Sequence, residues 1–333
     1  MTIPQRIAAT LPIPPSIEGT IAHAVWAEER GFDDVWFSDS GTGDPLTLAG
    51  GVGASTKRVR IGTAIIPVFT RTPAVFAATA LALDHLCSGR FLLGLGASSE
   101  TMMEGWNGVT FDKPLTRVKE TTLLVQRMLS GEKTSFEGVT LRSHGYRQEA
   151  LDPARVPIYI AGLRGKMLEL AGEIGSGAVI NLFPRRALPA IVSHVDAGAR
   201  RAGATVAERE IVCRHQVLVT DDDAGGRDFF RHSFVPYYAT PVYNKFLAWA
   251  GFEGAAAAIA EGWAARDRAK TAAAMTDELV NEIAIIGSEA YCQDRVRELG
   301  EGGVDTHIIA CPSMKPEDMQ RTFDAFTADR FQF

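Results

Sequence analysis

The sequence offers few features that would tie the protein to a membrane. Among its 333 residues, no uninterrupted apolar run approaches the roughly 18 residues that indicate a transmembrane helix. The N-terminal stretch is interrupted by prolines and does not have the layout of a signal peptide. We therefore expect a cytoplasmic protein with no membrane partner.

Metal ligands and basic runs are equally scarce. The four cysteines lie far apart without CxxC spacing, and the seven histidines form neither an HExxH motif nor a His-x-His pair, which argues against a bound metal. The 34 basic and 40 acidic side chains give a net charge of −6, and no Lys/Arg run could neutralise a line of phosphates. We expect no nucleic-acid partner.

What the sequence does contain is a strict alternation of strand-like and helix-like segments. Eight strands are predicted, and they are expected at 6–11, 34–38, 59–66, 90–95, 158–161, 178–181, 211–220 and 306–310. Such alternation predicts an α/β protein with a parallel sheet, and eight units favour a closed (β/α)8 TIM barrel over an open doubly wound sheet. We expect one domain over 1–333, with a hairpin insertion at 131–155 and a helical insertion at 224–285.

The loops that follow the strands should carry the function, because catalytic groups of such barrels lie at the carboxyl ends of the strands. Asp39 follows the second strand and could accept a hydrogen bond from a ring nitrogen, or cap the next helix. The third strand ends in an apolar stretch, 64–69, on which a flat ring could rest, although core packing would explain it equally.

Two further loops have contrasting signals. Residues 94–99, GLGASS, place Ser99 where a dinucleotide fingerprint has its third glycine, so a close backbone approach with two hydroxyls is the better interpretation. Residues 162–166, GLRGK, lead directly into a helix, and the free N–H groups of a helix start beside two cations would cradle a phosphate. A solvated turn with incidental charges is the alternative.

The seventh strand and the segment after it carry the remaining candidates. His215 could be a proton donor or a core histidine, and no GxSxG motif indicates a serine nucleophile. The aromatic segment 234–252 could roof an apolar pocket, form a dimer surface or pack on the barrel.

Taken in order, these segments resemble the luciferase-like flavin and deazaflavin oxidoreductases. The resemblance is to the branch similar to methylenetetrahydromethanopterin reductase, which uses coenzyme F420, and it spans nearly the whole chain. Its pieces are AEERGFDDVWFSDS (27–40), the long stretch at 58–99, EGW followed by FDKPLTR (104–117) and PIYIAGLRGKMLELAGEIGSGAVIN (157–181).

The resemblance implies where the cofactor lies. The ring rests against a bulge in the third strand that often contains a non-prolyl cis peptide, here at Ala64-Ile65, with Asp39 beside the ring. The loops at 96–98 and 162–166 match segments that hold the ribityl chain and phosphate. The predicted cofactor-binding residues are Asp39, Ala64, Ile65, Gly96, Ala97, Ser98, Gly162, Leu163, Arg164, Gly165, Lys166 and Asn181.

One departure concerns the proton donor. Many members of the family have a histidine where this chain has Ser40, so Ser40, Glu100 and His215 become candidates beside Asp39. The predicted substrate pocket consists of Tyr237, Tyr238, Tyr243 and Trp249.

The expected function is hydride transfer between reduced F420 and a C=C, C=N or C=O carbon of a small substrate. An FMN-dependent luciferase-like monooxygenase and a non-catalytic flavin- or deazaflavin-binding protein are the alternatives. The resemblance also implies a homodimer.

Overall fold

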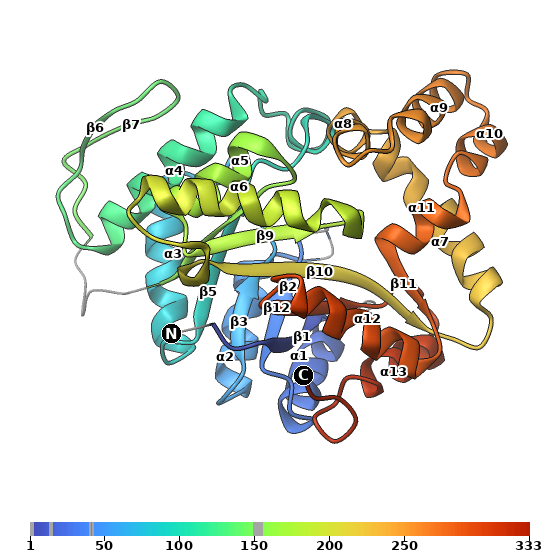
Figure 1. Cartoon of the computed structure of the whole chain (residues 1–333). Helices are drawn as coiled ribbons and strands as arrows, with labels where there is room; N and C mark the ends of the chain where they lie inside the picture. Colours follow the sequence, from blue (N-terminus) through green and yellow to red (C-terminus); the bar gives the residue numbers. More distant parts are fainter. Residues whose placement is uncertain (1–2, 13–15, 40, 42, 149–155) are drawn as a thin grey trace.

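The computed structural model describes residues 3–12, 16–39, 41, 43–148 and 156–333, in which strands and helices alternate along the chain (Figure 1). The strands of the main sheet are β1 Arg6–Leu11, β2 Asp34–Phe37, β3 Arg60–Thr63, β4 Ile66–Pro67, β5 Phe91–Gly96, β8 Ile158–Ala161, β9 Gly177–Asn181, β10 Glu210–Val219, β11 Ala284–Gly287 and β12 Thr306–Ala310.

Eight of these strands close a parallel barrel. Its order is β1-β2-β3-β5-β8-β9-β10-β12, and β12 returns to β1. The barrel closes through β10, which pairs with β9 on one side along 210–214 and with β12 on the other along 212–216. The predicted TIM barrel is confirmed.

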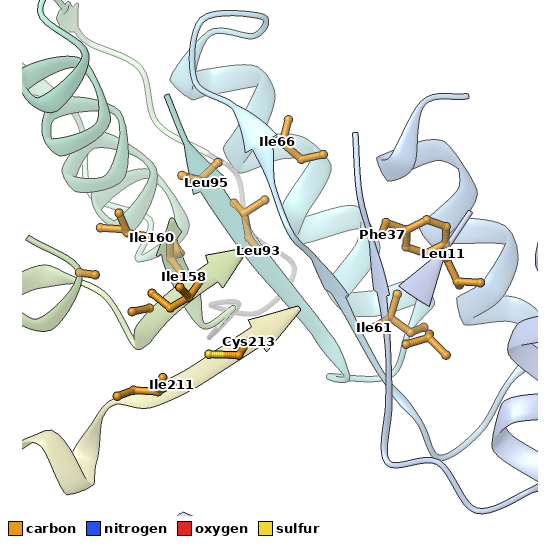
Figure 2. Packing of buried hydrophobic residues seen from close by; sticks show 14 of the residues in the cluster. Leu11, Phe37, Ile61, Ile66, Leu93, Leu95, Ile158, Ile160, Ile211 and Cys213 are labelled. Atoms are coloured by element: carbon orange, nitrogen blue, oxygen red, sulfur yellow. The ribbon is translucent and has the colours of Figure 1, made fainter. Parts of the chain in front are cut away.

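Alternation along each strand separates two layers of core. One set of strand side chains packs outward under the helices; Leu93, Ile160 and Cys213 belong to this layer on three different strands (Figure 2). The other set fills the barrel interior, where Trp36 and Tyr159 meet edge to face with ring centroids 5.5 Å apart. The interior is therefore a packed core, and a ligand must bind at one end of it.

The amino-terminal end of the barrel is closed by a buried polar cluster. Arg60 donates from Nε to Asp34 Oδ1 at 2.7 Å and from Nη2 to Glu210 Oε1 at 2.7 Å. Tyr159 and Thr306 donate their hydroxyls to the same Glu210. Each residue sits in the first half of its strand, so this end of the barrel serves stability and the opposite end is free for function.

Helices surround the barrel, and several begin where the sequence supplies a cap. The Ser16 side chain accepts from Gly19 N–H and Asp44 from Thr47 N–H. The surrounding helices are α1 Ile17–Glu29, α2 Pro45–Ser55, α3 Pro73–Leu86, α4 Pro114–Leu129, α5 Gly165–Ile174, α6 Leu188–Arg201, α12 Glu289–Glu301 and α13 Pro316–Asp324.

Two segments stand outside the alternation of barrel strands and surrounding helices. The hairpin consists of β6 Ser135–Glu137 and β7 Arg142–His144, while 149–155 of the predicted range lie outside the described residues. The helical insertion follows β10 and extends to one side of the barrel in Figure 1. It contains α7 Asp223–Ala239, α8 Pro241–Trp249, α9 Glu253–Ala264, α10 Arg268–Ala273 and α11 Asp277–Ile283.

Several features differ from the sequence prediction. The third strand is divided into β3 and β4, because the chain bulges at 64–65. The helical insertion ends at Ile283, and 284–287 form β11 on the carboxyl-terminal half of β10. The helix α12 and a single π-helical turn at Thr101–Trp106 were not predicted. No helix in the described part of the chain is long and apolar enough to span a membrane.

Candidate functional site

The loop after β2 brings Asp39 to the rim of the barrel. Asp39 lines a surface cavity of about 470 Å³ together with Thr70 and Arg71 from the loop after β4 and Asn107 from the end of the π-helical turn. Burial raises the pKa of Asp39, and Asp44 adds to this while Arg71 opposes it. A partly buried carboxyl that retains a proton more readily than usual is thus placed beside a cation. Ser40 lies outside the described residues.

The bulge between β3 and β4 is at the predicted position. The Ala64-Ile65 peptide bond is cis, as the resemblance implied. Both side chains pack against the apolar interior of the barrel and remain partly exposed above it. The bulge therefore forms an apolar surface at the carboxyl end of the barrel.

Two glycines of β5 make room for this bulge. A β-carbon on Gly94 would lie 1.8 Å from the carbonyl oxygen of Thr63, and one on Gly96 would lie 2.8 Å from Cδ1 of Ile65. Gly94 also donates its N–H to Thr63 Oγ1 at 2.8 Å. The GLG sequence thus serves the close approach of two strands, which agrees with a close backbone approach rather than a dinucleotide fingerprint.

The loop after β5 continues along the rim. Ala97 packs on the hydrophobic core, and Ser98 adopts a positive φ of 64° with its hydroxyl 3.3 Å from the sulfur of Met102. Glu100 precedes the π-helical turn and is exposed. These residues lie beside the bulge, and Glu100 is accessible to solvent.

The loop after β8 forms an open helix start. The α5 helix begins at Gly165, whose φ is 49°, and the residue before it, Arg164, makes no capping hydrogen bond. Within the described residues, neither Arg164 nor Lys166 forms an ion pair with a carboxylate. Gly162 is buried against the same helix, where a β-carbon would lie 3.1 Å from Leu168 N, and Leu163 packs on the core. This arrangement exposes free N–H groups and two cations to an anion.

Polar side chains gather where β9 and β10 face the helical insertion. Asn181, the last residue of β9, donates from Nδ2 to the Tyr243 hydroxyl at 3.4 Å. Burial raises the pKa of Tyr243 to about 12, so its hydroxyl stays protonated. Arg214 of β10 is level with Asn181 in the sheet and donates from Nε to Thr10 Oγ1 at 3.2 Å. Three strands therefore supply polar groups to one end of the barrel.

Three of the four aromatic residues predicted to form a pocket, Tyr237, Tyr238 and Tyr243, belong to one cluster of contacting rings. Tyr237 and Tyr243 lie edge to face, 6.2 Å between centroids, and both are close enough to Arg214 to affect its pKa. Tyr238 is fully buried in the core of the insertion and donates its hydroxyl to the carbonyl of Leu182 at 2.9 Å. Trp249 packs on Phe246 and His194. Tyr237 and Tyr243 lie nearest Arg214, and Tyr238 contacts Tyr243 edge to face with 5.8 Å between ring centroids.

His215 faces away from these groups, which corrects its assignment as a possible proton donor. Strand alternation turns it outward from the barrel, where its Nε2 lies 3.1 Å from Nδ1 of His307. Burial lowers the pKa of His215 to about 3, so it is neutral at physiological pH. It is a core histidine with a hydrogen-bond partner.

Two residues of this region were missed from the sequence. Arg71 pairs with Asp44 across the cavity beside Asp39. Arg214 is the neighbour of His215 in the sequence and was not among the predicted residues. The sequence did contain a signal for Arg214, because it is a cation within the apolar strand IVCRHQVLV. It is four residues from Glu210, so both side chains point into the barrel, where Glu210 belongs to the inward-facing cluster. No group of three metal-binding side chains occurs among the residues that the structure describes.

Comparison with known proteins adds family evidence to this geometry. Residues 1–306 match the protein family described as luciferase-like monooxygenase. The 5,10-methylenetetrahydromethanopterin reductase of Methanolobus tindarius is 29% identical over 300 residues, which cover 89% of this chain and 91% of that protein.

Two solved structures share the fold over 99% of this chain and 100% of theirs. The coenzyme F420-dependent tetrahydromethanopterin reductase of Methanopyrus kandleri aligns with a TM-score of 0.82 at 19% identity. An F420-dependent secondary alcohol dehydrogenase in complex with an F420-acetone adduct aligns with a TM-score of 0.79 at 18% identity. At these identities the structural similarity establishes the barrel.

Proposed function

The chain belongs to the luciferase-like monooxygenase family, and on that premise we propose that it is an F420-dependent oxidoreductase. Bound at the carboxyl end of the barrel, the reduced deazaflavin would supply a hydride to an electrophilic C=C, C=N or C=O carbon of a small substrate. The observation that carries the proposal is the pairing, at one end of the barrel, of an apolar bulge at 64–65 with an open, cationic helix start at 164–166. The chain is similar in sequence to a methylenetetrahydromethanopterin reductase and in fold to a coenzyme F420-dependent reductase. This similarity supports the choice of cofactor.

The bulge suits a flat ring. Ala64 and Ile65 present apolar atoms above the packed interior. Because Gly94 and Gly96 have no side chains, the bulge can lie close against β5. A ring resting on it would be held by contact on one face and left open to a substrate on the other. The protein's part is to keep the two planes together and to exclude water.

The start of α5 suits the phosphate end of the cofactor. Arg164 and Lys166 have no carboxylate partner in the described part of the chain, and the first N–H groups of α5 have no side-chain cap. An anion bound here would satisfy these donors and neutralise the cations. Ala97 and Ser98 lie on the neighbouring strand's loop and would contact the chain between ring and phosphate.

Asp39 is proposed to lie beside the ring and to exchange a proton with it or with the substrate. Burial raises the pKa of Asp39, so its carboxyl holds a proton more readily than an exposed aspartate does. Glu100, exposed on the adjacent loop, and Ser40 are the other candidates for the proton donor.

The second candidate is an FMN-dependent monooxygenase of the luciferase type. The family description favours it, and the helix start at 164–166 would accept the phosphate of either cofactor. The expected homodimer and cytoplasmic location stay predictions.

Turnover with labelled cofactor tests the proposal. Reduced F420 carrying deuterium at C5 is incubated with the protein and a panel of enones, imines and ketones, and products are examined by mass spectrometry. Transfer of one deuterium to a substrate carbon is the expected result. Oxygen-dependent product formation with reduced FMN, and none with reduced F420, would establish the second candidate instead.

A further inference from the structure

The strand β10 directs two polar side chains toward the substrate end of the barrel. Arg214 and Gln216 are two residues apart and therefore share a face, and Val212 below them belongs to the apolar interior. Cys213 and His215 alternate to the opposite face, under the helices. Arg214 thus emerges directly above the packed interior of the barrel.

The same apolar interior supports the bulge. Ala64 and Ile65 pack against the cluster to which Val212 belongs. Arg214 and the proposed ring surface therefore rise from one apolar layer, on different strands of the barrel.

Arg214 lacks the partner that a buried cation normally has. Its Nε donates to Thr10, but within the described residues its two terminal amino groups make no hydrogen bond and no carboxylate pairs with it. The titratable groups that face it are the hydroxyls of Tyr237 and Tyr243, and burial lowers the pKa of Arg214. A partly buried guanidinium left in this state is costly unless a ligand supplies an anion.

A second partly buried arginine of the barrel, Arg60, has the carboxylate partners that Arg214 lacks in the described ranges. Arg60, at the amino-terminal end, faces two carboxylates, Asp34 and Glu210. Arg60 is thus paired inside the fold, whereas Arg214 has no counter-charge among the residues that the structure describes.

Two neutral groups beside Arg214 also have no hydrogen-bond partner in the described part of the chain. Gln216 is 2% exposed and its Nε2 is buried without a hydrogen-bond partner, and the same holds for Oδ1 of Asn181, on the strand next to β10. Buried polar atoms are satisfied in most folded proteins, so a pair left open beside a cation points to a ligand that completes them.

We propose that Arg214 is the substrate-recognition residue of this enzyme and that it binds a carboxylate, so that the substrate is a small unsaturated carboxylic acid. Gln216 would donate to the same carboxylate, and the Tyr243 hydroxyl would complete the pocket. The planar guanidinium offers two parallel donors that match the two oxygens of a carboxylate. One cation balances one negative charge, whereas a phosphate dianion would leave a second charge uncompensated. This inference rests on the proposed function, because the acid is taken to be the hydride acceptor.

The first experiment measures binding without turnover. Isothermal titration of the protein, with and without oxidised F420, uses a series of α,β-unsaturated acids from acrylate to cinnamate and the matching amides at millimolar concentration. Acids are expected to bind and amides to bind about 10- to 100-fold more weakly, as for loss of a charged hydrogen bond. Equal binding of acids and amides, or no acid binding at all, would overturn the proposal.

Variants test whether Arg214 causes the preference for acids over amides. Arg214→Met removes the charge and should weaken acid binding about 10- to 100-fold without altering amide binding, while Arg214→Lys keeps the charge but not the fork and should fall between. Arg200→Met removes an exposed guanidinium on α6 and serves as the matched control, expected to bind acids as the unaltered protein does. Retention of acid preference in Arg214→Met would refute the assignment.

Cofactor binding separates this inference from the function on which it rests. Quenching of F420 fluorescence is titrated for the unaltered protein and for Arg214→Met, and the two affinities should agree. If Arg214→Met loses F420 binding, Arg214 belongs to the cofactor site and the proposal is wrong. If the unaltered protein does not bind F420 yet prefers acids through Arg214, the anion site stands and the proposed function fails.

Discussion

The carbonyl oxygen of Thr63 lies so close to Gly94 that a β-carbon on the glycine would be 1.8 Å from it. The contact joins β3 to β5 directly below the bulge at 64–65, and the Thr63 hydroxyl strengthens it by accepting from Gly94 N–H at 2.8 Å and donating to Gly94 O at 3.1 Å. The shape of the proposed ring surface therefore depends on the absence of one side chain.

Replacing that glycine should damage the site and the fold together. Gly94→Ala forces β3 and β5 apart and is expected to lower the free energy of unfolding by about 3 kcal/mol and to abolish tight F420 binding. Urea unfolding and quenching of F420 fluorescence measure the two effects.

A glycine in open space provides the control. A β-carbon on Gly254, in α9, would have nothing within 4 Å. Gly254→Ala should leave cofactor binding unchanged and raise stability by up to about 1 kcal/mol. If Gly94→Ala behaved like Gly254→Ala, the close contact would not shape the site.

The cations at the start of α5 should contribute to cofactor affinity alone. Arg164→Ala and Lys166→Ala are each expected to weaken F420 binding about tenfold, with a smaller effect at high salt, because both interact with an anion through charge. Stability should hardly change, since neither forms an ion pair in the described part of the chain. Lys119→Ala, an exposed lysine on α4, is the matched control. If both test variants bound F420 with unchanged affinity, the phosphate of the cofactor would not bind at the start of α5.

The polar cluster at the amino-terminal end should matter for stability and not for binding. Arg60→Met removes the cation between the buried carboxylates of Asp34 and Glu210 and leaves Glu210 with the longer contact to Arg6, at 3.5 Å, so the expected loss of stability is about 3 to 5 kcal/mol. Denaturant unfolding checks the value, with Arg200→Met again as control. A loss below about 1 kcal/mol would mean that water or neighbouring hydroxyls compensate the charges.

The free energy of unfolding should depend on pH through Glu210. Burial alone would raise its pKa, but hydrogen bonds from Arg60 and the charge of Arg60 outweigh burial and lower the pKa to about 2, from 4.5 in an unfolded chain. Because the folded-state pKa is depressed, this stabilisation is complete above pH 4.5 and is lost as the pH falls toward about 2.

Comparison with Glu210→Gln isolates this effect from other groups. The stability difference between the unaltered protein and Glu210→Gln should shrink by about 3 kcal/mol between neutral pH and about pH 2. Unfolding curves recorded at a series of pH values provide the measurement. A difference that stays constant across this range would show that Glu210 titrates normally in the folded protein.

Much of the barrel was predictable because its signals are local. A six-residue apolar strand such as 6–11 is recognised from its run of apolar residues. A helix such as the one after Ser16 is recognised from its capping residue. The strand at 284–287 was missed because AIIG is short and directly continues an apolar helix, so only its pairing with β10 distinguishes it.

The site was less predictable, because it depends on which way a strand side chain points. His215 and Arg214 are neighbours in sequence, yet one enters the outer core and the other the barrel end. Pairing register decides this, and a single-residue error in parity exchanges the two roles. The position of the bulge came from family resemblance, since the residues around 64–65 are also consistent with plain core.

The central claim is that the barrel end binds a deazaflavin, and direct competition tests it. The purified protein is titrated with F420 and with FMN, each followed by fluorescence, and then with one cofactor in the presence of the other. The account predicts micromolar or tighter binding of F420, with FMN much weaker and displaced by it. Tight binding of FMN with no response to F420 would contradict it.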